Sequence, residues 1–136
     1  MRGKIALSLL LSVVLFAVPV SAVYPNAAEE IVLAEYIAGE ADGEPYAVHL
    51  AMAAALLNRL TDPRYPDTVS GVLSLLGYRT RRHTESYVFA RSAVRAAAEG
   101  LDITGGATAW AKADTEKAAR LTETFRVEDF VFGREG

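Results

Sequence analysis

The chain has 136 residues, a formal net charge of −3 and no cysteine. The missing cysteine excludes a disulfide framework, a zinc–thiolate site, a thiol nucleophile and the lipid anchor of a lipoprotein. The acidic balance argues against nucleic acid and anionic membranes as partners, because both attract basic surfaces.

The first 22 residues have the pattern of a signal peptide. Arg2 and Lys4 precede an apolar stretch, and the triplet that ends at Ala22 has small residues where a signal peptidase reads the chain. A membrane anchor is the competing interpretation, but the stretch is shorter than the roughly 20 apolar residues of a spanning helix. We therefore expect export, cleavage after Ala22, no stable membrane association afterwards, and a single domain at 23–136.

Two helices are predicted in the first half of this domain. Asn26 and Glu29 have the spacing of a capping box, and apolar residues at helical spacing follow to about Gly39. A second helix at 45–60, with a proline in its first turn, carries an apolar stripe that ends at Arg59 and is widened by alanines. Small side chains allow close packing, so we expect this helix at the centre of the domain.

Two more helices are predicted further along the chain. Asp67 is expected to cap a short helix at 68–76, and a longer helix runs from 85 or 86 to 99 and ends at Gly100. An arginine-rich loop at 77–85 is expected between them.

The C-terminal part has a different character. Short β-like runs occur at 124–127 and 130–132, after a helix-like link at 114–121 with Asp114 as its cap. These elements predict an α+β domain, mainly helical, with a two- to three-stranded antiparallel sheet toward the C-terminus.

The junction between the first two helices carries a candidate general acid. Glu40 falls in the last turn of a helix with mostly apolar neighbours, and partial burial would keep its proton available near neutral pH. A solvated glutamate at a helix end is the alternative. Glu44 is expected to act as a cap, because Pro45 moves it away from helical dihedrals. His49 and His83 fall on different elements, so no metal or other cofactor is expected.

Four blocks of the sequence, in this order, resemble the SleB-type cell wall hydrolases, the spore cortex-lytic family; they are residues 40–46, 51–59, 63–72 and 102–107. The resemblance implies a small lysozyme-like domain that cleaves peptidoglycan glycan strands between N-acetylmuramic acid and N-acetylglucosamine, as a lytic transglycosylase. It also implies that Glu40 is the catalytic acid. We expect a monomer that acts in the cell wall or spore cortex.

Other candidate site residues follow from the chemistry of a glycan substrate. Tyr78 and Trp110 are candidates for packing on sugar rings, although core packing is an equal alternative for Trp110. Gly105 and Gly106 would let the backbone approach the glycan, and Glu44 is a candidate for substrate binding.

One departure from the family pattern keeps a second function open. The family's Gly-x-His-x-Phe ending reads Glu-Asp-Phe-Val-Phe at 128–132, so its histidine is missing. The alternative is a secreted module of the same fold that binds or regulates peptidoglycan with little or no turnover.

The signal peptide generates a prediction. We expect the exported protein to begin at Val23, because the triplet that ends at Ala22 is the cleavage pattern. N-terminal sequencing of protein from the culture medium or wall fraction measures this. Recovery of the uncleaved chain from the membrane fraction would show an anchor instead.

Overall fold

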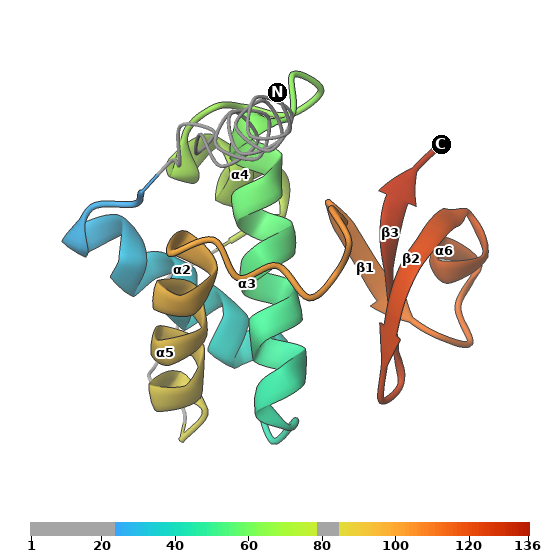
Figure 1. Ribbon diagram of the computed structural model, residues 1–136, viewed down its shortest axis with the longest axis horizontal. Helices are drawn as coiled ribbons and strands as arrows, with labels where there is room; N and C mark the ends of the chain where they lie inside the picture. Colours follow the sequence, from blue (N-terminus) through green and yellow to red (C-terminus); the bar gives the residue numbers. More distant parts are fainter. Residues whose placement is uncertain (1–23, 79–84) are drawn as a thin grey trace, which may run out of the picture.

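The computed structural model describes residues 24–78 and 85–136. Helices form the first part of the chain and an antiparallel sheet the last, and α3 lies between α5 and the sheet (Figure 1). This confirms the predicted α+β class. The expected signal peptide and residues 79–84 of the arginine-rich loop lie outside the described residues. The elements in chain order are α2 (Ala27–Glu40), α3 (Tyr46–Thr61), α4 (Val69–Leu75), α5 (Tyr87–Ala98), β1 (Ala109–Lys112), α6 (Glu116–Ala119), β2 (Leu121–Val127) and β3 (Phe130–Glu135).

Helix α2 begins with the capping box that the sequence predicts. The Asn26 side chain accepts a hydrogen bond from the Glu29 N–H at 2.8 Å, and the Glu29 carboxylate accepts one from the Asn26 N–H at 2.9 Å. Both donors at the helix start are therefore satisfied. The helix ends at Glu40, and the chain turns through Gly43 at a φ of +77°, a conformation that glycine adopts without a steric penalty.

Helix α3 is the central helix of the core, as its alanine-rich stripe predicts. Ala51 and Ala55 are fully buried, and their small side chains let neighbouring elements approach closely. The N-cap is Pro45, and no side chain caps this helix. The prediction that Glu44 is a cap is therefore wrong, because Glu44 lies one residue before the position from which a side chain reaches the first turn. Its carboxylate oxygen lies 3.6 Å from Lys112 Nζ instead.

Threonines, and not the predicted aspartates, cap the two short helices. The Thr68 hydroxyl accepts a hydrogen bond from the Gly71 N–H at 3.1 Å at the start of α4, and Thr115 accepts one from Ala118 at 3.3 Å in α6. A cap side chain reaches the N–H three residues ahead of it. Asp67 and Asp114 each lie one residue too early for this contact.

Helix α5 ends at the glycine that the sequence predicts. The Leu101 N–H donates to the Ala96 carbonyl at 3.1 Å, and the Gly100 N–H donates to the Ala97 carbonyl at 3.0 Å. This pair of bonds is a Schellman motif, and it requires the left-handed backbone that Gly100 adopts at φ +108°. The motif directs the chain away from the helices and toward the sheet.

A turn anchored by Asp102 connects α5 to the sheet. Its carboxylate accepts hydrogen bonds from the Thr104 N–H and hydroxyl, from the Gly106 N–H and from the Asn58 side-chain amide on α3. Partial burial raises the pKa of Asp102, but these hydrogen bonds stabilise the charged form more strongly, so its pKa lies below the ordinary value of 3.8. The turn therefore depends on an ionised Asp102.

The sheet has the strand order β1-β3-β2, with all neighbours antiparallel. Strands β2 and β3 contain the two predicted β-like runs, and they join through Glu128 at a φ of +50°. Alternate residues point to opposite faces. Trp110 and Phe132 belong to the main core, whereas Ala111 and Val131 lie outside that core and form a smaller cluster beneath α6.

The longest helix described, α3, has 16 residues. No helix within residues 24–78 and 85–136 is long and apolar enough to cross a membrane.

The packing of α3 generates a prediction. Ala55→Leu should destabilise the fold by about 1–3 kcal/mol, because the fully buried site has no space for a larger side chain. Thermal or urea unfolding measures this. Ala28→Leu, on an exposed position of α2, is the matched control and should change stability little. Equal stability of the two variants would mean that this face of α3 is loosely packed.

The Asp102 turn generates a second prediction. Asp102→Asn should cost about 1–2 kcal/mol at neutral pH, because the new amide group turns a donor toward other donors; partial exposure keeps the cost modest. The stabilisation is complete above the ordinary aspartate pKa of 3.8 and disappears as the pH falls through the lower folded-state value.

Urea unfolding of both proteins over a pH series checks this second prediction. Asp114→Asn, in an exposed turn, is the matched control. A difference between wild type and Asp102→Asn that persists undiminished in strong acid would contradict the role of the ionised carboxylate.

Candidate active site

A groove of about 470 Å³ lies between the helices and the sheet, beside the end of α2. Helices α2 and α3 contribute one side, and β1, β3 and the start of α6 contribute the other. Glu40 is the one acidic residue among the described residues that line it. These residues are Tyr36, Glu40, Arg59, Leu76, Trp110, Ala111, Lys112, Thr115, Lys117 and Phe130.

Glu40 is exposed at the end of α2, so the expected partial burial is wrong. Tyr36 lies one helical turn earlier on the same face, which brings both side chains to the groove. Ile37 and Ala41 lie on the adjacent face, and they are fully buried. The helix therefore directs its apolar stripe into the core and leaves the carboxylate accessible from the groove.

Aromatic side chains form much of the groove wall. Trp110 is only 7% exposed, and its ring packs between Tyr36, at a centroid distance of 6.4 Å, and Phe132, at 6.3 Å. Both alternatives for Trp110 are thus visible, since it packs in the core and also lines the groove. Most of this side chain is therefore unavailable to a ligand.

Three cationic side chains line the same groove as Glu40: Arg59, Lys112 and Lys117. Lys112 Nζ lies 3.6 Å from the Glu44 carboxylate and 4.3 Å from the centroid of the Phe130 ring. Glu44 does not line the groove itself, but its carboxylate forms an ion pair with Lys112, which does.

These cations were not among the residues singled out from the sequence. For Arg59 a signal was present, since a charged residue ended the apolar stripe of a helix expected at the centre of the core. For the two lysines no such signal existed, because the fold alone brings β1 and α6 to the end of α2.

Tyr78 is not among the described residues that line the groove. It is half-buried, and its hydroxyl donates a hydrogen bond to Glu35 at 2.9 Å. Its ring packs edge-on against Tyr36 at a centroid distance of 6.1 Å. Tyr78 thus supports a tyrosine that lines the groove, and its predicted contact with sugar stays a prediction.

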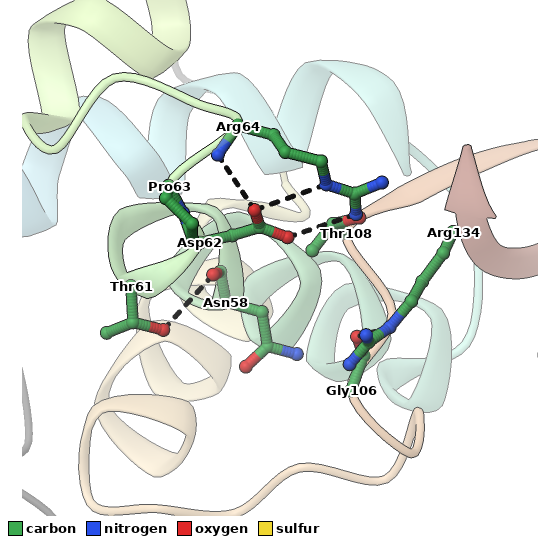
Figure 2. A pocket seen from close by; sticks show the side chains of 8 residues that line it. All are labelled: Asn58, Thr61, Asp62, Pro63, Arg64, Gly106, Thr108 and Arg134. Atoms are coloured by element: carbon green, nitrogen blue, oxygen red, sulfur yellow. Dashed lines mark hydrogen bonds and ion pairs between the residues drawn. The ribbon is translucent and has the colours of Figure 1, made fainter. Parts of the chain in front are cut away.

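Gly105 and Gly106 are not brought to the Glu40 groove. Both have positive φ angles, +69° and +87°, so the Asp102 turn itself favours glycine here. Gly106 lines a second pocket of about 470 Å³ near the end of α3. Figure 2 shows that pocket, with Arg64 folded back on Asp62 and Arg134 reaching toward Gly106. The expected approach of a glycan to these glycines stays a prediction.

His49 is fully buried in α3, away from the groove lining. Its Nδ1 lies 3.1 Å from the Pro45 carbonyl oxygen, and its Nε2 has no hydrogen-bond partner within residues 24–78 and 85–136. Burial lowers the pKa of His49, because the apolar surroundings disfavour the charged ring. In the described parts of the chain, no three His, Asp or Glu side chains are grouped so that they could hold a metal ion.

Comparison with known proteins adds relatives of one kind, although no family model matches the chain. Spore cortex-lytic enzymes are 42% identical over 88 residues in Halalkalibacterium halodurans, 39% over 92 in Oceanobacillus iheyensis and 36% over 92 in Bacillus cereus. Each match covers 61% of this chain, but only 27%, 32% and 34% of the relative. The chain thus spans about a third or less of the curated relatives it matches.

Two solved structures resemble nearly the whole described fold. The catalytic domain of the Bacillus cereus SleB protein matches with a TM-score of 0.66 and 29% identity, over 81% of this chain and 94% of that domain. The catalytic domain of the germination-specific lytic transglycosylase SleB from Bacillus anthracis matches with a TM-score of 0.66 and 28% identity, over 80% and 98%. The shared fold and the sequence matches show that the chain resembles the SleB-type cell wall hydrolases over most of its described residues.

Proposed function

We propose that this protein cleaves the glycan strands of peptidoglycan as a lytic transglycosylase, with Glu40 as its catalytic acid and base. The observation that carries the proposal is the position of Glu40, which is the single acidic side chain among the described residues of a groove between helices and sheet. The relatives, which are named as cortex-lytic enzymes and a lytic transglycosylase domain, support the same reaction.

The reaction needs one carboxyl group that gives and then takes a proton. Protonated Glu40 gives its proton to the glycosidic oxygen as the bond to muramyl C1 breaks, and an oxocarbenium-like species forms. The muramyl 6-hydroxyl oxygen then bonds to C1, and its proton returns to Glu40. The products are a 1,6-anhydromuramyl end and a new N-acetylglucosamine 4-hydroxyl, with no water consumed.

The surroundings of Glu40 suit a single-carboxylate mechanism. Glycosidases that use water pair two carboxyl groups across the scissile bond, whereas Glu44 lies outside the groove lining and contacts Lys112. Tyr36 and Trp110, which both line the groove, offer apolar surface to a sugar ring. Glu44 would bind substrate only indirectly, by orienting Lys112.

The site of action follows from the N-terminal sequence. A cleaved signal peptide would deliver residues 23–136 outside the cytoplasm, where peptidoglycan is found. The relatives' names associate them with the spore cortex. We propose an exported monomer that acts on the cell wall or the cortex.

One observation favours a second candidate function. The missing histidine of the family's ending corresponds to Phe130, which lines the groove beside Lys112. A phenyl ring neither donates nor accepts a proton, so a peptidoglycan-binding module with little turnover is the alternative. Incubation with peptidoglycan separates the two, because binding without release of soluble fragments would support the module.

The role of Glu40 generates a prediction. Glu40→Gln should reduce glycan cleavage by ~10²–10⁴-fold or more, because the amide keeps the shape of the side chain but has no titratable proton. Folding and glycan binding should persist. Release of muropeptides from purified peptidoglycan, alongside thermal unfolding, measures both. Glu99→Gln, on an exposed position after α5, is the matched control, and Glu44→Gln should have a smaller effect than Glu40→Gln.

Product masses test the reaction type separately. Transglycosylase products should be about 18 Da lighter than hydrolysis products, because the internal hydroxyl replaces water. Undiminished activity in Glu40→Gln would remove Glu40 as the acid. Hydrated products alone would leave a muramidase or glucosaminidase.

A further inference from the structure

Arg59 is a buried charge on the groove wall. Among the described residues it is the only Arg, Lys, Asp or Glu side chain that is buried, at 5% exposure. A charge removed from water costs several kcal/mol unless it is paired and hydrogen-bonded. The contacts of Arg59 therefore show how far its buried charge is already compensated within the protein.

The described contacts use only part of the guanidinium. Nε donates a hydrogen bond of 2.6 Å to the Thr108 carbonyl, and the group lies 4.6 Å from the Tyr65 ring centroid and 5.8 Å from that of Trp110. Arg59 forms no ion pair with a described carboxylate, Glu40 included, and its two terminal nitrogens have no described acceptor.

A purely structural role explains only part of the Arg59 guanidinium. The bond to Thr108 and the aromatic contacts join α3 to the sheet, and they account for Nε and the faces of the guanidinium plane. They do not account for the terminal N–H groups. Because Arg59 lines the groove, these donors are available to a ligand in the space that Glu40 also faces.

The chemistry of the neighbours defines the ligand. Lys112 and Lys117 line the same groove, so its cations outnumber Glu40, and Glu44 offsets only Lys112. A planar guanidinium whose two terminal nitrogens have no acceptor among the described residues matches a carboxylate, which it binds through two parallel hydrogen bonds. A neutral sugar hydroxyl would leave the buried charge without a counter-charge.

We propose that Arg59, with Lys112 and Lys117 beside it, forms a carboxylate-binding subsite for the acidic substituent of the muramyl residue. The carboxylate belongs either to a free lactyl group or to a stem peptide attached to it. Arg59 is a positioning residue in this proposal, because it holds the muramyl ring so that the glycosidic oxygen faces Glu40. The inference rests on the proposed function for its substrate.

The first test changes the substrate and leaves the protein intact. Glycan oligomers stripped of stem peptides carry free lactyl carboxylates, and conversion to methylamides removes the charge while it preserves the sugar. Binding to Glu40→Gln protein, measured by calorimetry, should be roughly tenfold to a hundredfold weaker for the methylamide. Equal affinity for these two oligomers would exclude the lactyl carboxylate as the bound group.

A second pair of oligomers, with stem peptides whose carboxylates are free or methylamidated, identifies the source of the charge. A preference for the charged form in either pair supports the subsite, and the pair that shows it names the carboxylate. Absence of a preference in both pairs contradicts it.

The protein side of the test uses Arg59→Gln and Arg59→Lys. Arg59→Gln should abolish the preference for the charged oligomer and raise its KM more than it lowers kcat. Arg59→Lys should restore part of the preference, because it keeps the charge but not the planar donor pair. A structural role alone would weaken binding of charged and neutral oligomers equally. Arg126→Gln, which removes an exposed arginine on β2, is the matched control.

Two further results keep the test decisive. If the Arg59 variants do not fold, Lys117→Gln on the exposed face of α6 should still reduce the preference, and an unchanged preference there would count against the subsite.

Failure of the proposed function is distinguishable from failure of the subsite. Carboxylate preference without cleavage leaves the subsite in a binding module, whereas cleavage without preference removes the subsite alone. Binding of neither oligomer overturns both.

Discussion

The attachment of the sheet to α3 is the constraint on which the groove depends. Two consecutive residues near the end of α3 make it. Asn58 donates to the Asp102 carboxylate at 3.0 Å and to the Ala107 carbonyl at 2.9 Å, and Arg59 donates to the Thr108 carbonyl at 2.6 Å. These bonds fix the segment that enters β1, and so they set where Trp110 and Lys112 lie relative to the end of α2.

The rest of the architecture supports this attachment. Fully buried alanines on α3 let α5 pack closely against one side while the sheet lies on the other (Figure 1). Because β3 pairs with both β1 and β2, fixing β1 also places Phe130 at the groove. Glu40 therefore lines the same groove as residues of the sheet, although they are far apart in the sequence.

The electrostatics of the groove differ from the usual picture of a buried catalytic acid. Glu40 is exposed, whereas the buried charge is a cation, Arg59. An accessible carboxyl group surrounded by cations and aromatic edges suits an elongated, acidic sugar polymer, which must enter an open groove and leave it again. In the proposed complex, Arg59, which would hold the substrate, is thus more deeply buried than Glu40, the proposed acid.

Local patterns of the sequence determined the helices, their order and one half of the site. The capping box at Asn26, the apolar stripe of α3 and the glycine after α5 act within a few residues, so each could be predicted. Asp67, Asp114 and Glu44 were wrong as caps, because a shift of one residue decides which side chain reaches a free N–H.

The other half of the site was decided by tertiary structure. Whether Glu40 is buried, whether Tyr78 or Gly106 reaches its groove, and which cations face it depend on how the sheet docks on α3. That docking involves residues far apart in the chain, such as Arg59 and Thr108. The sequence therefore determined the candidate acid, Glu40, and the helix that carries it, whereas long-range hydrogen bonds and packing decided which residues surround that carboxylate.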